Sequence, residues 1–136
     1  METLQLEVVT PERLLLATEA KMVTIPGQDG LFGVMPGHTP FLSGVKAGLL
    51  VIGDIERGER YVVSRGFAQV HRNQVTVLVD QAVAEKDLSA KTATRDLEQA
   101  RQALSGLAPE DPAHAACLEQ VAFAEACLAL TGSGKR

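Results

Sequence analysis

Residues 74–100, QVTVLVDQAVAEKDLSAKTATRDLEQA, contain the change of hydrophobic period that decides the fold. In the first part, Val75, Val77 and Val79 recur with a period of two, which is typical of a half-buried β-strand. From residue 88 onward the apolar residues are instead three and four positions apart, which is the spacing of one face of an α-helix. The sequence therefore predicts a β-region up to about Ala84 and a helical region after it.

The β-region consists of short apolar segments separated by turn residues. Leu4, Leu6 and Val8 again recur with a period of two. Turn signals follow at short intervals, at Thr10-Pro11, in PGQDG at 26–30, and in the pairs at 36–37, 57–58 and 72–73. Many short strands joined by regular turns are typical of an antiparallel β-sandwich or flattened barrel. We therefore expect this architecture for the N-terminal part.

The helical region is expected to contain two helices. The first covers about residues 88–107 and is capped by Asp87 or Ser89. The proline-containing segment APEDP at 108–112 ends it, and a second helix covers about residues 113–130 and ends at Gly132. A connection this short places the two helices antiparallel to each other, as a hairpin.

The second predicted helix is more apolar than one partner helix requires. In its segment CLEQVAFAEACLAL, residues 117–130, only Glu119, Gln120 and Glu125 are clearly polar. We therefore expect this helix to contact the sandwich or another chain as well as the first helix. Together these patterns predict a mainly β plus α protein, with a β-sandwich at 1–86 and a helical hairpin at 87–136 that ends in a flexible tail.

Length, composition and charge exclude several classes of function. With 136 residues, 46% of them hydrophobic, the chain is long enough for one compact core. A net charge of -4 and a pI near 5.3 argue against a nucleic-acid-binding protein, which needs a concentrated basic face. The N-terminus lacks the basic start and apolar run of a signal peptide, and we expect no segment with the ~20 apolar residues of a membrane span.

Groups for catalysis or metal binding are not arranged in any familiar pattern. The histidines, His38, His71 and His114, are far apart in the sequence and lack the spacing of a metal site. Cys117 and Cys127 lie in one predicted helix at roughly 15 Å from each other, which excludes a disulfide between them. No GxSxG motif and no dinucleotide fingerprint is present. We therefore expect no catalytic site, no cofactor and no metal.

The stretch GQDGLFGVMPGHTPFLSGVKAG, residues 27–48, combines turn residues with large apolar ones. Asp29-Gly30 is a hairpin turn signal. Strand alternation sends neighbours such as Leu31 and Phe32 to opposite faces. Either all the apolar side chains of residues 31–35 enter the core, or some remain exposed as a docking patch with His38 at its rim. Periodicity alone leaves both possibilities open.

Segments from most of the chain resemble the epsilon subunits of bacterial F-type ATP synthases, which are similar to the mitochondrial delta subunit. They are LQLEVVTPERLLL at 4–16, IPGQDGLFGVMPGHTPFLSGVKAGLL at 25–50 and SRGFAQVHRNQVTVLVDQAV at 64–83, followed by the two-helix region. The pattern PGxxGxFGVxPGHxPFL in the middle segment is the most specific of these features. The resemblance agrees with the sandwich and hairpin predicted independently above.

The resemblance implies a noncatalytic subunit of the central stalk, or rotor. In the family the sandwich binds the gamma subunit and rests on the ring of membrane-embedded c subunits, so that rotation reaches the alpha/beta catalytic head. This implies a peripheral position on the cytoplasmic face of the bacterial plasma membrane. The positions that match the family's c-ring contact are Asp29, Gly30, Leu31 and His38.

The family's helical hairpin is a mobile element that inhibits ATP hydrolysis when it extends along gamma toward the head. In this chain we expect the regulatory residues of the hairpin to be Lys91, Arg95, Arg101, Leu118, Val121 and Phe123. The rival hypothesis is a stand-alone β-sandwich binding module whose hairpin only covers one sheet. The joint presence of the glycine-proline-histidine stretch and the helical region favours the rotor subunit.

Two departures from the family pattern affect the hairpin. Some members bind ATP through a motif of the form I/L-D-x-x-R-A, but residues 88–93 here are LSAKTA, so the acid and the arginine are both replaced. We therefore expect no nucleotide cofactor. The family's inhibition also depends on basic residues of the second helix, and residues 113–130 contain no Lys or Arg. This predicts inhibition that is weaker or less sensitive to salt.

Overall fold

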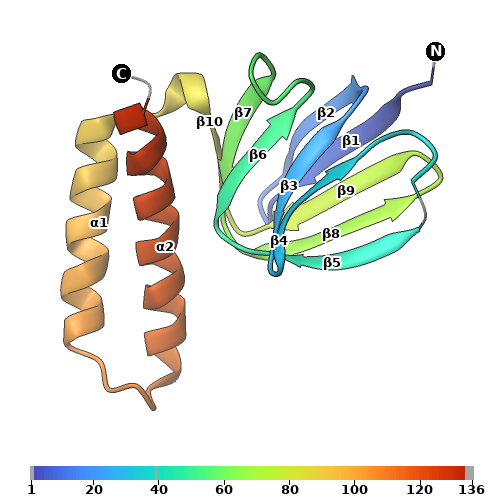
Figure 1. Cartoon of the computed structure of the whole chain (residues 1–136). Helices are drawn as coiled ribbons and strands as arrows, with labels where there is room; N and C mark the ends of the chain where they lie inside the picture. Colours follow the sequence, from blue (N-terminus) through green and yellow to red (C-terminus); the bar gives the residue numbers. More distant parts are fainter. Residues whose placement is uncertain (1, 39, 134–136) are drawn as a thin grey trace.

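The computed structural model of the chain describes residues 2–38 and 40–133, and these residues form a β-sandwich followed by two packed helices (Figure 1). The predicted fold class is therefore confirmed. The strands are β1 (Leu4–Val9), β2 (Leu14–Ala20), β3 (Val23–Gly27), β4 (Gly30–Val34), β5 (Phe41–Val45), β6 (Gly48–Ile52), β7 (Glu59–Val63), β8 (Gly66–His71), β9 (Gln74–Val79) and β10 (Ala82–Ala84). The helices are the 3-10 turn η1 (Glu85–Asp87), α1 (Ala90–Ser105) and α2 (Pro112–Ser133).

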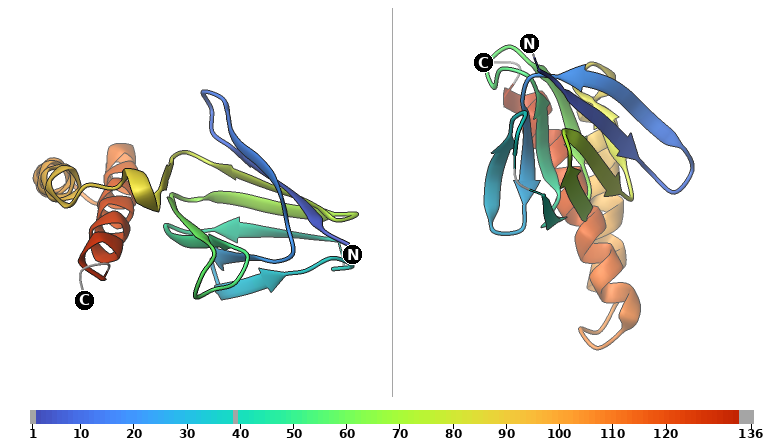
Figure 2. Two further views of the ribbon diagram at one scale, coloured as in Figure 1. Left: turned by 90° about the horizontal axis from the view of Figure 1, so that it is seen from above. Right: turned by 90° about the vertical axis from the view of Figure 1, so that its right-hand side faces the viewer.

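The strands are hydrogen-bonded in the order β10-β7-β6-β3-β5-β8-β9-β1-β2, with β4 paired to β3 beside this path. The sheet curls over so that its two halves face each other around the core (Figure 2). The pairs are antiparallel except for β1 and β9, which run parallel. This parallel pair joins the first strand to one near the end of the sandwich, a non-local contact that local turn signals did not predict.

The core follows from the alternation in the sequence. Val75, Val77 and Val79 of β9 point inward, and the alternate residues of β1 are buried beside them. In a strand successive side chains point to opposite faces, so each alternating strand contributes one face to the core. The core is built from aliphatic side chains at Leu4, Leu6, Val8, Val23, Ile25, Val34, Val45, Leu50, Val63 and Val70 as well as those of β9.

Ser89 is the N-cap of α1, which decides between the two predicted caps. Its Oγ accepts a hydrogen bond from the backbone N–H of Thr92 at 3.2 Å. Helix α2 begins at Pro112, where the missing N–H of proline costs no helical hydrogen bond. It continues to Ser133, so Gly132 does not end it as predicted. The rest of the predicted flexible tail, residues 134–136, lies outside the described residues.

The helices dock on the sandwich through a small apolar contact. Phe123 and Cys127 of α2 and Ala93 of α1 pack with Val62 of β7. The expectation that α2 contacts more than its partner helix is thus confirmed. Tyr61, next to Val62 on β7, packs instead against the sandwich core and pairs with Ala84 of β10, the strand that leads into η1. Burial, and then the negative charges of Glu59 and Asp87, raise the pKa of its phenol.

One feature of α2 differs from the expectation. Its segment Pro112–Thr131 has a mean hydropathy of 1.2 over its most apolar window and is long enough to cross a membrane. Many small apolar residues raise this mean, although Glu119 and Glu125 interrupt the segment. Length and composition alone do not separate a membrane span from a helix that packs inside a protein, and this helix packs against α1 and the sandwich.

Candidate partner-binding surfaces

The β3–β4 hairpin carries the predicted turn residues. Gln28 and Asp29 form its two-residue loop, and Gly30 follows with a φ of 128°, a conformation that favours glycine. The backbone N–H of Gln28 donates to the carbonyl of Gly44 at 3.1 Å, which ties the loop to β5. Leu31, the first residue after Gly30, is 69% exposed. The turn therefore presents a carboxylate and an apolar side chain to solvent on a fixed backbone.

Residues 31–35 divide between core and surface, which answers the question that their sequence left open. Phe32 packs against the core and Val34 is fully buried within it. Leu31 and Met35 are exposed. The first alternative is therefore wrong, because some of these apolar side chains are exposed; their use as a docking patch stays a prediction.

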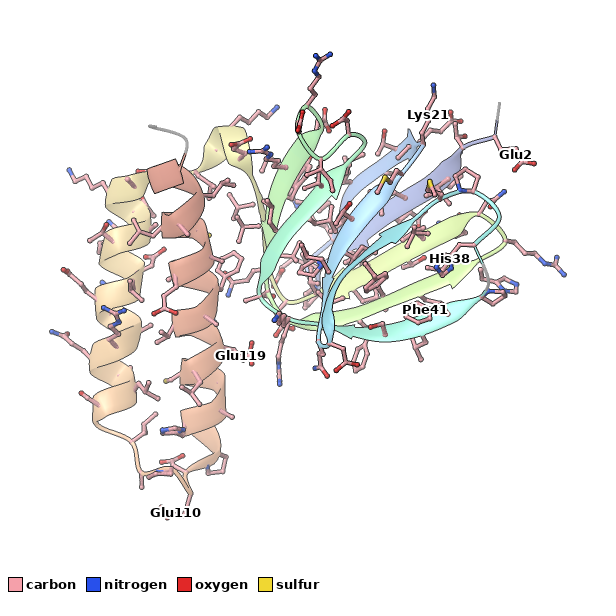
Figure 3. The ribbon with its side chains drawn as sticks, viewed as in Figure 1. Glu2, Lys21, His38, Phe41, Glu110 and Glu119 are labelled. Carbon is pink, nitrogen blue, oxygen red and sulfur yellow. The ribbon has the colours of Figure 1, made fainter. Side chains whose placement is uncertain are left out.

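His38 lies in a turn that is held at both sides. Its backbone N–H donates to the carbonyl of Met35 at 3.1 Å, and the N–H of Gly37 donates to Oδ1 of Asn73 at 2.7 Å. The imidazole lies edge-on to the ring of Phe41 at 5.8 Å between centroids (Figure 3). Phe41 in turn lies 5.2 Å from Phe32. His38 is thus the outer member of an aromatic row that leads into the core.

The predicted c-ring residues do not form a single cluster. Asp29, Gly30 and Leu31 lie where β4 begins, whereas His38 follows the end of β4. The five residues of β4 separate these two ends by roughly 13 Å at the rise of an extended strand. A partner that contacts all four residues must therefore extend along the whole length of β4.

A second exposed apolar surface lies on the outer face of β5, β8 and β9. We name it the outer-face patch and define it as Leu42, Phe67 and Leu78, which are 70%, 59% and 45% exposed. Phe67 pairs directly with Leu78 on one side and with Gly44 on the other. Leu42 pairs with Gln69, two residues along β8 from Phe67, and residues that pair across antiparallel strands point to the same face, so the three side chains lie on one surface.

A groove of about 500 Å³ adjoins the outer-face patch. Phe67 and Leu78 line it together with Val9 at the end of β1 and Gln28 of the β3–β4 loop. Arg65 and Asp80 lie at its edge, with 4.0 Å between Nε of the arginine and Oδ2 of the aspartate. The groove therefore connects the patch to the turn that carries Asp29.

Sequence reasoning did not single out the outer-face patch, although the signal was present. Phe67 and Leu78 are out of phase with the buried residues Ala68, Val77 and Val79, so alternation alone directs them outward. An apolar residue on the solvent face of a strand indicates a covered or docking surface when several gather there. What the sequence could not provide was the strand pairing that brings Leu42 beside them.

The predicted regulatory residues of the hairpin occupy different environments. Lys91 and Arg95 are exposed on α1, and Nη2 of Arg101 contacts Oε2 of Glu125 at 3.1 Å across the two helices. On α2, Leu118 is exposed and Val121 is half-buried. Phe123 is buried against the sandwich. Contacts of Phe123 with another partner thus require the hairpin to leave the sandwich.

Among the described residues, the possible metal ligands and the buried thiol of Cys127 are the groups to consider for chemical activity. No group of three or more His, Cys, Asp or Glu side chains that could hold a metal ion occurs within residues 2–38 and 40–133. Burial, and then the nearby charge of Asp96, raise the pKa of the Cys127 thiol to about 11. A thiol with so high a pKa is a poor nucleophile at neutral pH.

Comparison with known proteins identifies the family. The model of the β-sandwich domain of the ATP synthase delta/epsilon chain matches residues 3–85. The chain belongs to this family. It is 39% identical over 127 residues to the ATP synthase epsilon chain of Magnetococcus marinus, covering 93% of both chains. Family membership confirms the prediction of a noncatalytic ATP synthase subunit and decides against a stand-alone binding module.

Two solved structures each contain a chain with the fold of this protein. A chain in the structure of the Euglena gracilis mitochondrial ATP synthase, OSCP/F1/c-ring in rotational state 1, has a TM-score of 0.74 at 21% identity, over 95% of this chain and 81% of that one. A chain in the central stalk/c-ring structure of the Tetrahymena thermophila mitochondrial ATP synthase has a TM-score of 0.53 at 15% identity, over 63% of this chain and 69% of that one. The first likeness spans sandwich and helices together.

Proposed function

We propose that this chain is a rotor subunit in the central stalk of an F-type ATP synthase, where it couples rotation of the c ring through gamma to ATP synthesis. Its sandwich, residues 1–86, binds gamma and the c ring, and its hairpin, residues 87–136, regulates ATP hydrolysis. As part of this proposal, it is a peripheral subunit at the cytoplasmic face of a bacterial plasma membrane. Family membership supports this proposal, and so does the exposed apolar surface of the sandwich.

The outer-face patch is the observation that carries the proposal, and we assign it to gamma. Leu42, Phe67 and Leu78 form an apolar surface that water would otherwise cover, which is typical of an interface with another protein. The groove beside this surface can receive a protruding side chain of the partner. Gamma is the proposed partner because it is the protein that binds the sandwich in this family.

We assign the β3–β4 turn to the c ring. Asp29, Gly30 and Leu31 lie at the end of a hairpin that β5 holds in place, as a fixed contact with a rotating ring requires. His38 is the fourth proposed contact, and the ring must then span the length of β4. Cysteines introduced at Asp29 and at His38, one at a time, test this by crosslinking to the c subunits. A crosslink from the first position alone would remove His38 from the proposal.

The hairpin is proposed to inhibit ATP hydrolysis after it leaves the sandwich. Its docking contact is small, so its release exposes only Phe123, Cys127 and their neighbours. Residues 113–130 carry no Lys or Arg, and inhibition then depends on apolar contact, on Lys91, Arg95 and Arg101 of α1, or on the terminal Lys135 and Arg136. We therefore expect inhibition that is weaker or less sensitive to salt than in members with a basic second helix.

Two experiments test the proposed function. Co-purification of the chain with the gamma subunit at a one-to-one ratio is expected, and failure to bind gamma would refute the rotor assignment. Deletion of residues 88–136 is expected to raise ATP hydrolysis by the reconstituted complex while gamma binding is retained. Unchanged hydrolysis by a complex that contains the shortened chain would refute the regulatory role of the hairpin.

A further inference from the structure

The hairpin that joins β8 to β9 turns on two residues that are not glycine. Arg72 has a φ of 52° and Asn73 a φ of 62°, and within residues 2–38 and 40–133 they are the only residues other than glycine with a positive φ. His71 pairs with Gln74, so these two residues form the whole loop, and their φ values match a type I′ turn. A side chain on such a backbone costs free energy, which indicates a role for at least one of the two side chains.

Asn73 occupies the position of this turn that glycine suits best, because Asn-Gly and Asp-Gly are favoured pairs in type I′ turns. Its side chain is used at a distance in the sequence, since Oδ1 accepts the backbone N–H of Gly37 at 2.7 Å. Its backbone carbonyl accepts the N–H of Gln5 at 2.8 Å. Asn73 therefore ties together the β8–β9 turn, the start of β1 and the turn that precedes β5.

The turn that Asn73 holds is the one that presents His38. We name residues 35–38 the His38 turn, which is closed by the N–H of His38 donating to the carbonyl of Met35 at 3.1 Å. Pro36 in its second position and Gly37 in its third, with a φ of 88°, match a type II turn. The bond that closes such a turn does not use the N–H of the third residue, and here that N–H is the one that Asn73 accepts.

Strand pairing brings Asn73 and the His38 turn together although they are far apart in the sequence. Phe41 at the start of β5 pairs with Val70 near the end of β8, so the turn before β5 and the turn after β8 lie at the same end of the sandwich (Figure 1). The ring of His38 lies edge-on to that of Phe41 at 5.8 Å between centroids. The ring contact thus holds the side chain of His38, and the bond to Asn73 holds the backbone beside it.

We propose that Asn73 is a positioning residue, which holds the His38 turn in the place where His38 contacts the c ring. The first part, the hold on the turn, concerns the isolated chain. The second part, the effect on the ring contact, rests on the proposed function. A turn that is released visits several positions, and a contact that only one position can make is weakened by the fraction of time spent in the others.

Amide hydrogen exchange of Gly37, measured by nuclear magnetic resonance on the full chain, tests the first part. Asn73→Gly removes the side-chain acceptor and keeps a backbone that suits the turn. Exchange at Gly37 is expected to rise roughly 2- to 12-fold, which corresponds to the loss of one hydrogen bond of ordinary strength. Asn73→Asp keeps an oxygen acceptor and tolerates a positive φ, so it is expected to restore the original rate. Unchanged exchange in Asn73→Gly would overturn the proposal.

A matched control separates the hydrogen bond from the flexibility of the β8–β9 turn. Arg72→Gly introduces the same residue one position earlier in the same turn and leaves the side chain of Asn73 in place. It is expected to leave the exchange of Gly37 unchanged. An equal rise in Arg72→Gly and Asn73→Gly would mean that turn flexibility is the cause, and would overturn the assignment to the Asn73 side chain.

Crosslinking in the reconstituted complex tests the second part. His38→Cys and Asp29→Cys are introduced one at a time, each with and without Asn73→Gly, and crosslinked to the c subunits. Asn73→Gly is expected to lower the yield from position 38 alone, because β5 holds the turn of Asp29, and Asn73→Asp is expected to restore it. An unchanged yield from position 38, or an equal loss from both positions, would overturn this part.

Failure of the proposed function gives a different result. If His38→Cys does not crosslink to the c subunits even when Asn73 is present, the proposed ring contact of His38 is refuted, and the second part with it. The exchange rate of Gly37 does not depend on the ring, so it still decides whether Asn73 holds the His38 turn.

Discussion

The variant Phe67→Ala is expected to weaken gamma binding strongly while the chain still folds. Phe67 is 59% exposed, so of a side-chain area of roughly 200 Å² about 120 Å² remains for a partner to bury. At about 25 cal/mol per Å² this area corresponds to ~3 kcal/mol of binding free energy if gamma covers it fully. Alanine retains a small part of this area, so we expect a loss of about 2–3 kcal/mol, or roughly 30- to 140-fold in Kd.

Calorimetric titration of the isolated chain with purified gamma measures this loss. Ile55→Ala is the matched control, because Ile55 is 54% exposed in the turn between β6 and β7 and belongs neither to the outer-face patch nor to its groove. The control is expected to bind gamma with the original Kd. Thermal denaturation of Phe67→Ala is expected to show a folded chain with a lowered Tm, because the remaining roughly 80 Å² of the side chain is already buried in the free chain and contributes about 2 kcal/mol. Equal gamma affinity of Phe67→Ala and the original chain would refute the assignment of this surface.

The remaining predictions concern stability. A Cβ at Gly66 would lie 1.9 Å from the carbonyl oxygen of Leu78, so Gly66→Ala is expected to lower the free energy of unfolding, measured by chemical denaturation, by ~1–3 kcal/mol. Gly106→Ala is the control, because the nearest atom to its Cβ is 3.8 Å away, and it should leave the stability of the sandwich unchanged. If Gly66→Ala had the same free energy of unfolding as the original chain, this would contradict the described packing of β8 against β9. The pKa of the Cys127 thiol is raised to about 11 from an ordinary 9.0, so between these pH values the folded chain holds a proton that the unfolded chain has lost. The free energy of unfolding should accordingly fall as pH rises from 9.0 to about 11. A Cys127→Ala variant that shows the same fall would mean that Cys127 is not its cause.

The sequence predicted the fold well because its signals are local. The alternation of Val75, Val77 and Val79 determined a strand, and the change to helical spacing after Ala84 determined the boundary between strands and helices. The site was less predictable because it depends on pairing between distant segments. No local pattern places Leu42 next to Phe67, since β5 and β8 are joined only in the folded sheet.

The same distinction explains the predicted c-ring residues. Asp29 and His38 are nine positions apart in a turn-rich stretch, and the sequence alone did not show how far apart the fold places them. The structure instead uses the residues between them to build β4, and an extended strand carries its ends away from each other. The strand between the two turns thus separates them by more than the glycine and proline content of the stretch indicates.

The position of Tyr61 gives the molecule a built-in optical reporter. The sequence contains one tyrosine and no tryptophan, so the tyrosine absorbance and fluorescence of the chain come from one ring, which packs against the sandwich core where β10 leads into η1. Asp87, one of the charges that raise the pKa of the phenol, belongs to η1. When the hairpin swings away and carries η1 with it, the phenol should ionise at lower pH. Opening can therefore be followed spectrophotometrically, without a label, in the unmodified chain.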